Sequence, residues 1–182
     1  MGKAIMINIE KCLACKSCEI ACAVAHSRSK VLHEAAQEVP KPQRRVTVQA
    51  AGEFAVPLQC RHCDDAPCIA VCPTAAIYRQ ETDGPVLIEQ DRCIGCKFCL
   101  VVCPFGVIDV SSDGKAVVKC DLCIERAKAG EEPACVEACP TKALKLVDEK
   151  ELAASRRQHA AQELVLATQK DKKKEKHKES TQ

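Results

Sequence analysis

Cysteine is the residue type in this sequence whose spacing carries the clearest chemistry. The chain has 182 residues and 16 cysteines, and all of the cysteines fall into four groups of four. The groups are Cys12, Cys15, Cys18, Cys22; Cys60, Cys63, Cys68, Cys72; Cys93, Cys96, Cys99, Cys103; and Cys120, Cys123, Cys135, Cys139. Closely spaced cysteines bind iron or zinc as thiolates or pair as disulfides. The spacing inside each group has to decide among these chemistries.

The third group has the most informative spacing. Its cysteines are separated by two, two and three residues, and Pro104 follows the last one directly. Bacterial ferredoxins hold 4Fe-4S clusters with this run, and its fourth cysteine binds the other cluster of a pair. A proline after that cysteine ends the helical turn without leaving an N–H unpaired. Pro73 and Pro140 follow Cys72 and Cys139 in the same way.

The other groups vary the gaps but keep the ligands. The first group keeps the spacing and has Ala23 after its last cysteine, the second widens one gap to four residues, and the fourth separates Cys123 from Cys135 by eleven residues. None of these changes removes a cysteine. The sequence therefore predicts four 4Fe-4S clusters bound by the sixteen cysteines, in two pairs if fourth cysteines are exchanged between groups.

Structural zinc and a disulfide framework are the alternatives. A zinc site built from four cysteines needs two pairs, and it has no use for a third cysteine two residues further on or for a proline after the fourth. A disulfide framework needs an oxidising compartment. Residues 1–9 have one lysine and no apolar signal segment, so we expect a reducing cytoplasm in which the cysteines are available to metal.

Short strands and helical turns must present these cysteines. Around the third group, residues 86–88 and 106–110 read as strands and 98–103 as a helical turn. The same plan recurs around the first and fourth groups, with strands expected at 5–9, 116–118 and 143–147. The predicted fold class is α+β, with duplicated bacterial-type two-cluster ferredoxin-like units.

The expected domain organisation follows from this repeat. Residues 1–147 form the four-cluster domain, in which the first pair of clusters comes from 1–22 and 111–147, the second pair comes from 60–110, and 23–59 is an ordered insertion with a strand at 46–49. Beyond it, 148–169 has apolar residues at helical spacing and predicts an amphipathic helix. Residues 170–182 are almost free of apolar side chains and predict a disordered basic tail.

Composition narrows the function classes. Aromatic residues are few, so the core must consist of aliphatic side chains packed around the clusters, and folding should depend on the metal. The net charge of +2 and the lack of a basic stripe with aromatics give no reason to invoke nucleic acid. No apolar run is long enough to span a membrane. Nucleotide-binding, hydrolase and metalloprotease motifs are absent, so we expect a carrier of electrons that is not itself an enzyme.

A few charged residues near the cysteines have open roles. His62 could be a ligand or a hydrogen-bond donor to sulfide or backbone. Lys97 and Lys119, beside ligand cysteines, could tune a reduction potential or lie in solvent. Three further residues, His26, Arg44 and Arg45, could contact a partner or form plain surface.

The cysteine groups resemble those of a known family. The chain is similar over 5–147 to the four-cluster ferredoxin-like electron-transfer subunits, which include the iron-sulfur subunits of dimethyl sulfoxide reductase and formate dehydrogenase. The resemblance implies exchange between the first and fourth groups and between the second and third. The implied clusters are held by Cys12, Cys15, Cys18 and Cys139; by Cys120, Cys123, Cys135 and Cys22; by Cys60, Cys63, Cys68 and Cys103; and by Cys93, Cys96, Cys99 and Cys72.

Short members of that family serve carbon monoxide dehydrogenase, formate dehydrogenase and hydrogenase in anaerobic metabolism. The run from Cys60 to Cys68, with Arg44 and Arg45 upstream, is similar to the carbon monoxide dehydrogenase partners. The resemblance thus implies a larger catalytic subunit and an acceptor protein as partners, and 148–169 could add self-association. Subunits of formate dehydrogenase, hydrogenase or aldehyde oxidoreductase complexes are alternatives of the same class, and a redox-sensing regulatory protein is one of another class.

Overall fold

Four small two-stranded sheets organise the cysteine-rich part of the chain. The structure is a computed structural model that describes residues 2–179. The strand pairs are β1 (Lys3–Ile7) with β8 (Leu144–Asp148), β2 (Val46–Ala51) with β3 (Phe54–Gln59), β4 (Ile77–Arg79) with β5 (Val86–Ile88), and β6 (Asp109–Val110) with β7 (Val117–Val118). The last three pairs are antiparallel.

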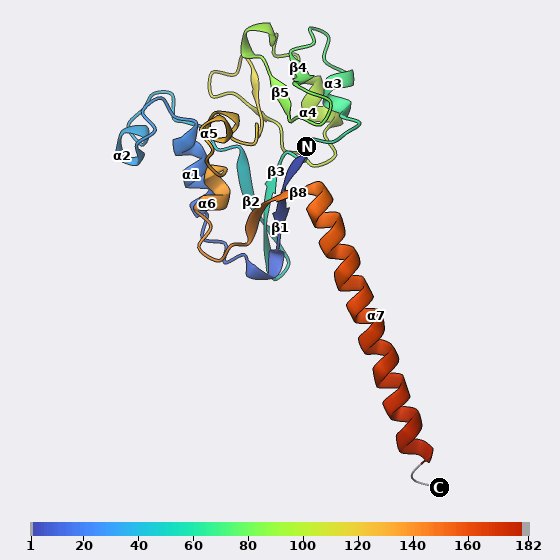
Figure 1. The fold of residues 1–182 in the computed structure, drawn as a ribbon. Coiled ribbons are helices and arrows are strands. Elements are labelled where there is room, and N and C mark those ends of the chain that lie inside the picture. Colours follow the sequence, from blue (N-terminus) through green and yellow to red (C-terminus); the bar gives the residue numbers. More distant parts are fainter. Residues whose placement is uncertain (1, 180–182) are drawn as a thin grey trace. The chain divides into compact units, whose positions relative to one another are not determined.

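These pairings connect particular cysteine groups. The β1 and β8 strands lie side by side although they precede the first group and follow the fourth (Figure 1). The β4 strand follows the second group and pairs with β5, which precedes the third. Pairing of β6 with β7 joins the end of the third group to the start of the fourth. The sheets therefore bring the first group to the fourth and the second to the third.

A short helix begins at or just before the third cysteine of every group. The helices are α1 (Ser17–Ala25), α3 (Pro67–Ala70), α4 (Phe98–Val102) and α6 (Ala134–Glu137), and they contain Cys18, Cys68, Cys99 and Cys135. All four of these cysteines are buried. The remaining helical segments of the same part are η1 (Ile9–Lys11), α2 (Leu32–Ala35), η2 (Gln90–Arg92) and α5 (Ile124–Lys128).

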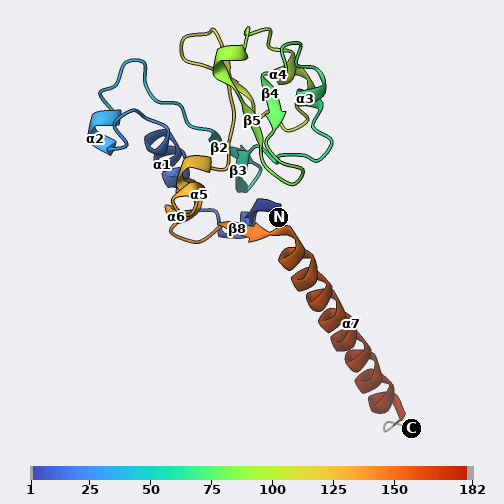
Figure 2. The same ribbon diagram turned by 45° about the horizontal axis from the view of Figure 1, so that its top comes forward.

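The helices and strands gather into two neighbourhoods. In both views, α3, α4, β4 and β5 lie together, and α1 lies beside α5 and α6 (Figures 1 and 2). Each neighbourhood has its own apolar core. Ile5, Val46, Val136 and Leu144 pack with cysteines of the first and fourth groups, whereas Ile77, Val86, Ile108 and Val117 pack with cysteines of the second and third.

The strands expected from the sequence are present. The strand at 86–88 is confirmed as β5, and those expected at 5–9, 46–49, 106–110, 116–118 and 143–147 correspond to β1, β2, β6, β7 and β8 with shifted ends. The turn at 98–103 is confirmed as α4. The observed fold is therefore a mixture of short helices and strands, as the α+β prediction required.

The C-terminal helix differs from the prediction. A compact unit ends at Leu146, and the unit that begins at Val147 consists mainly of α7 (Glu149–Glu179). The helix continues past 169, into the stretch expected to be disordered, because the sequence there has neither Gly nor Pro and is rich in Lys and Glu, which favour helices. Residues 180–182 of the expected tail lie outside the described residues.

The apolar stripe expected on this helix is also not continuous. Leu164 and Val165 are both exposed, at 70% and 55%, and as sequence neighbours they project about 100° apart. His159 and Glu163 form an ion pair one turn apart. Charged and apolar residues thus share the faces of α7. Within 2–179, no helix has both the length and the apolar character of a bilayer span.

Backbone with positive φ shapes the cysteine loops. Gly95 and Lys97 adopt this conformation in the third group, and Ala14 and Lys16 do so at the matching positions of the first. Such turns point successive N–H groups toward one point, where they bind an anionic group. Gly95 has a second constraint, because a Cβ there would lie 2.1 Å from the carbonyl oxygen of Lys115.

We predict that Gly95→Ala is far more damaging than Gly106→Ala. Both glycines have positive φ, but a Cβ on Gly106 meets nothing within 4 Å. The Gly106 variant should lose about 1–2 kcal/mol for the left-handed backbone, and the Gly95 variant should lose a further ~1–3 kcal/mol because the Lys115 backbone must move. Guanidinium unfolding of the anaerobically purified proteins measures both. Equal losses would show that the Gly95 contact is not restrictive.

Candidate metal centres

Cysteines from two groups line one pocket. It is formed by Cys60, Cys63 and Cys68 of the second group and Cys103 of the third, together with His62, Val86 and Phe105. The two strands β4 and β5 and the helices α3 and α4 bring these groups together. The fourth cysteine of the third group therefore lies with the first three cysteines of the second.

A second pocket has the reciprocal composition. Cys93, Cys96 and Cys99 of the third group line it with Cys72 of the second. Gly95 and Lys97, the residues with positive φ, lie in the same wall. The two pockets adjoin, since a charge on Cys68 opposes the ionisation of Cys99. The structure thus places the eight cysteines of these groups around two neighbouring pockets.

The first and fourth groups meet in the same reciprocal way. Negative charge on Cys139 opposes the ionisation of Cys15, and Cys12 and Cys15 act similarly on Cys18. Cys22 interacts electrostatically with Cys120, Cys123 and Cys135. Cys18 and Cys135 interact as well, which makes these two sets neighbours.

Burial keeps several of these thiols protonated when no cation is present. It raises the pKa of the Cys18, Cys22 and Cys99 thiols to about 11 and that of Cys135 to about 12. Burial also raises the pKa of the Cys120 thiol well above its ordinary value. All sixteen cysteines are free thiols. Because a metal ion deprotonates a thiol that coordinates it, sets of four thiols that each contain at least one buried member fit metal centres.

Two of the fourth cysteines have matching hydrogen bonds. Thr74 follows Cys72 and Thr141 follows Cys139 by two residues, and each hydroxyl lies 3.8 Å from the cysteine Sγ. The Ala143 N–H also donates to Cys139 Sγ at 3.2 Å. Burial works against ionisation of both thiols, but hydrogen bonds outweigh it and lower the pKa of each. The largest contributions come from the backbone N–H groups of Ile77 at Cys72 and of Leu144 at Cys139, followed by the threonine hydroxyls. Cysteine-proline-threonine is therefore a sequence signal for a fourth ligand that the spacing argument did not use.

His62 provides an independent indication of what the first pocket holds. Its Nδ1 accepts a hydrogen bond from the Val86 N–H at 3.0 Å, so the proton of the neutral ring lies on Nε2. Burial, with the Lys119 charge, lowers the pKa of His62 to about 3. The buried Nε2 has no hydrogen-bond partner in the part of the chain whose side chains the structure describes, 2–148 and 150–165. A buried N–H donor in a wall with four thiols fits a bound group that offers sulfur acceptors.

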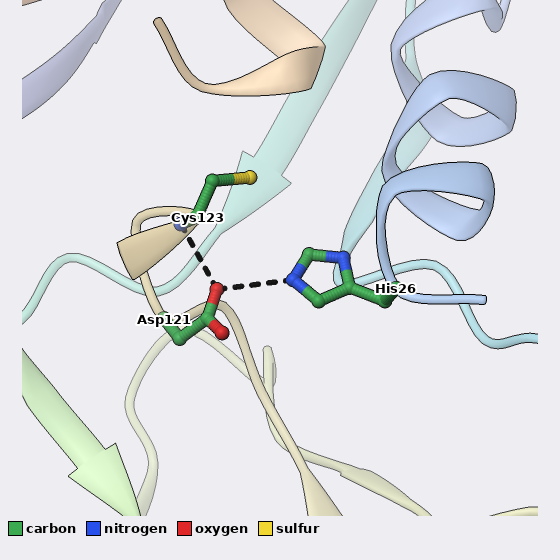
Figure 3. Close-up of side chains that lie close together, drawn as sticks. All are labelled: His26, Asp121 and Cys123. Atoms are coloured by element: carbon green, nitrogen blue, oxygen red, sulfur yellow. Dashed lines mark hydrogen bonds and ion pairs between the residues drawn. The ribbon is translucent and has the colours of Figure 1, made fainter. Parts of the chain in front are cut away.

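A charged cluster surrounds the cysteines at the start of the fourth group. The Asp121 carboxylate accepts hydrogen bonds from the Cys123 N–H at 2.9 Å and from His26 Nε2 at 3.1 Å (Figure 3). The Arg45 guanidinium pairs with its other oxygen. Burial opposes ionisation of Asp121, but His26 and Arg45 hold the pKa of its carboxyl well below the ordinary value. The Arg45 N–H also donates to Cys22 Sγ at 3.2 Å.

His26, Asp121 and Cys123 have ligand atoms within 4.8 Å of one another. This set is not a separate metal site. Both oxygens of Asp121 already accept hydrogen bonds, and Cys123 belongs to the set with Cys22, Cys120 and Cys135. His26 and Arg45 therefore support a cysteine centre, and neither is plain surface.

The other charged residues singled out from the sequence differ clearly in solvent exposure. Arg44 is half exposed and pairs with Glu19, and Lys97 is exposed. Lys119 is buried, with 4% of its surface accessible. Sequence reasoning missed Asp121 altogether, because a single aspartate between two cysteines has no distinguishing pattern.

Comparison with known proteins gives a consistent result. The family described as "4Fe-4S dicluster domain" matches residues 52–149, which is more than half of the chain. A second family, "4Fe-4S binding domain", matches residues 9–25 around the first cysteine group.

Three curated relatives match most of the chain. An "Iron-sulfur protein" of Rhodospirillum rubrum is 48% identical over 157 residues, which cover 79% of this chain and 81% of the relative. The "Putative electron transport protein YsaA" of Escherichia coli is 43% identical, with 81% and 91% covered. The "Thiosulfate reductase electron transfer subunit PhsB" of Salmonella typhi is 38% identical, with 81% and 78% covered.

We predict that Asp121→Ala destabilises the protein by about 2 kcal/mol, since it leaves the partly buried Arg45 and His26 without their carboxylate. Arg44→Ala is the matched control. It removes an ion pair whose arginine is half exposed, and it should cost less than about 1 kcal/mol. Guanidinium unfolding of the loaded proteins gives both values. An Asp121 variant as stable as the Arg44 variant would mean that the buried pairing contributes nothing to the free energy of unfolding.

Proposed function

Because the chain belongs to the 4Fe-4S dicluster family of iron-sulfur electron-transfer proteins, we propose that it is a four-cluster electron carrier of an oxidoreductase complex. It binds multiple 4Fe-4S clusters. The observation that carries the proposal is the reciprocal placement of fourth cysteines, by which Cys103 lies with the second group and Cys72 with the third. Such exchange is how two-cluster ferredoxins bind a pair of clusters close together.

The proposed ligands are the sixteen cysteines in four sets. The sets are Cys12, Cys15, Cys18, Cys139; Cys120, Cys123, Cys135, Cys22; Cys60, Cys63, Cys68, Cys103; and Cys93, Cys96, Cys99, Cys72. The first two sets form one pair, from 1–22 and 111–147, and the last two form the other, from 60–110. The two pairs are the proposed duplicated ferredoxin-like units, with 23–59 as the insertion and 1–147 as the domain.

The role of the protein in this function is to hold, space and shield the electron-carrying groups. A 4Fe-4S cluster accepts and releases one electron. The cysteine loops fix the positions of the thiolates, and their left-handed turns aim backbone N–H groups at the bound anion. Buried aliphatic side chains around each pair exclude water. With pairs joined through β6 and β7, the chain provides a continuous path for electrons and needs no catalytic residue of its own.

A larger catalytic subunit and an acceptor protein are the proposed partners, in the cytoplasm. The best candidate for the catalytic subunit is carbon monoxide dehydrogenase, by the similarity of Cys60 to Cys68 and of Arg44 and Arg45 to its partners. Formate dehydrogenase, hydrogenase and aldehyde oxidoreductase are the alternatives. One relative is by its name a subunit that serves thiosulfate reductase, which supports the general arrangement of carrier and enzyme. Self-association through 148–169 is a further proposal, which the size-exclusion volume of the chain with and without 148–182 would test.

Metal analysis and enzymatic reduction test the proposal together. Anaerobically purified protein should contain about sixteen irons and as many acid-labile sulfides per chain. Carbon monoxide with catalytic carbon monoxide dehydrogenase should bleach its visible absorption, and formate, hydrogen or aldehyde with their enzymes should do so more slowly. Zinc without sulfide would overturn the carrier itself. Fast reduction by another enzyme would replace only the partner, whereas full loading with no reduction by any of them would favour a redox sensor.

The pairing of ligands gives a sharper prediction. Cys139→Ser should disturb the same centre as Cys12→Ser, because both would belong to one cluster although 126 positions separate them in the sequence. Cys135→Ser is the control, since it belongs to the same cysteine group as Cys139 and should disturb a different centre. Electron paramagnetic resonance during redox titration distinguishes the centres. If Cys139→Ser and Cys135→Ser change the same signal, the proposed exchange is wrong.

A further inference from the structure

Lys119 is a buried cation without an anionic partner. It follows β7 directly, and 4% of its surface is accessible. Its Nζ donates hydrogen bonds to the carbonyl oxygens of Val86 and Cys120, the second at 2.9 Å. Among the side chains that the structure describes, in 2–148 and 150–165, no carboxylate forms an ion pair with it. Lysine is almost never fully buried unless it is paired, because an ammonium group removed from water loses a large solvation energy.

The backbone of Val86 connects Lys119 to the pocket of Cys60, Cys63, Cys68 and Cys103. Val86 lines that pocket. Its carbonyl oxygen accepts from Lys119, and its N–H donates to His62, another residue of the pocket wall. One residue of β5 therefore anchors two groups, the Lys119 ammonium and the His62 ring, beside the same four thiols.

Electrostatics place Lys119 near this pocket in particular. Burial raises the pKa of the Cys68 thiol, and the positive charge of Lys119 opposes that rise. The same charge disfavours protonation of His62. The Lys119 ammonium also donates to the carbonyl oxygen of Cys120. At the neighbouring thiols of Cys22 and Cys123, the positive charges that oppose the rise in pKa include those of Arg45 and Arg126.

We propose that Lys119 is the fixed counter-charge of the cluster held by Cys60, Cys63, Cys68 and Cys103, and that it raises the reduction potential of this cluster. The inference rests on the proposed function. A cluster with four thiolate ligands becomes more negative when it gains an electron, and a buried ammonium stabilises that state more than the oxidised one. Lys119 directly precedes the fourth cysteine group and therefore lies where the two pairs of cysteine sets meet. By raising the potential there, it favours the reduced state of the centre at this junction.

Lys119→Met tests the proposal, because methionine has a similar length and no charge. Iron and sulfide analysis of the unmodified protein comes first and tests the proposed function alone. Redox titration followed by electron paramagnetic resonance then compares the variants. Lys119→Met should disfavour the reduced form of one centre by about tenfold, which is a fall of about 59 mV for one electron. That centre should be the one whose signal Cys68→Ser alters.

Two controls separate charge from packing. Lys119→Arg keeps the charge. The equilibrium constant between the oxidised and reduced forms of this centre should therefore stay within a few-fold of that of the unmodified protein. Lys145→Met removes an exposed lysine of β8 that lines neither of the two pockets, and water should screen the loss. If Lys119→Met does not load with iron, Lys119→Gln serves as the second neutral variant and is read in the same way.

Each outcome decides the proposal. A lowered potential at the Cys68 centre in a fully loaded neutral variant supports it, as does loss of that cluster alone in both neutral variants while Lys119→Arg loads normally. Unchanged potentials in a loaded neutral variant overturn it. A shift at another centre, an equal shift in Lys145→Met, or loss of the cluster in Lys119→Arg as well would also overturn it, since the effect would not then come from this charge.

Discussion

A thiol removed from water holds its proton tightly, and the rest of this structure depends on that constraint. Burial raises the pKa of the Cys18, Cys22 and Cys99 thiols to about 11 and that of Cys135 to about 12. A thiolate at one of these positions is stable only when a metal cation coordinates its sulfur directly. The folded arrangement is therefore one in which metal binding and burial of the cysteines support each other.

The strands, sheets and apolar cores of the cysteine-rich part are small, and the bound clusters are therefore needed to hold them together. No strand in 2–146 exceeds six residues, and the sheets have two strands each. Sheets of this kind are marginal by themselves in water. The two apolar cores also count cysteines among their members. Bound clusters link segments that are far apart in the sequence, and they supply the cohesion that a larger aliphatic core would otherwise provide.

Charges are arranged around the cysteine sets with a clear asymmetry. Beside Cys22, the Arg45 guanidinium is balanced by Asp121, so that little net charge remains. Beside Cys68, the Lys119 ammonium meets only carbonyl oxygens. Reduction potentials of 4Fe-4S clusters depend on net charge, hydrogen bonds and exposure. If the four proposed ligand sets all consist of cysteines, the chain differentiates its centres through the residues behind the ligands.

The sequence by itself determined the chemistry, because ligand spacing and the prolines after Cys72, Cys103 and Cys139 are local properties of the chain. Short strands such as 86–88 were equally readable, since their apolar runs and flanking turns are local too. The C-terminal helix was also expected, and α7 extends to Glu179, whereas the disordered tail expected at 170–182 stays a prediction, because a lysine-rich sequence suits a helix and a disordered tail alike. Spacing did not show which cysteines meet across the chain, and the family resemblance implied the sets that the structure supports. Only the tertiary structure decided that His26 and Arg45 converge on Asp121, and that Lys119 is buried while Lys97 is exposed. Both lysines stand beside a ligand cysteine in the sequence, and their difference arises from strand pairing and burial between distant segments, which spacing along the chain does not encode.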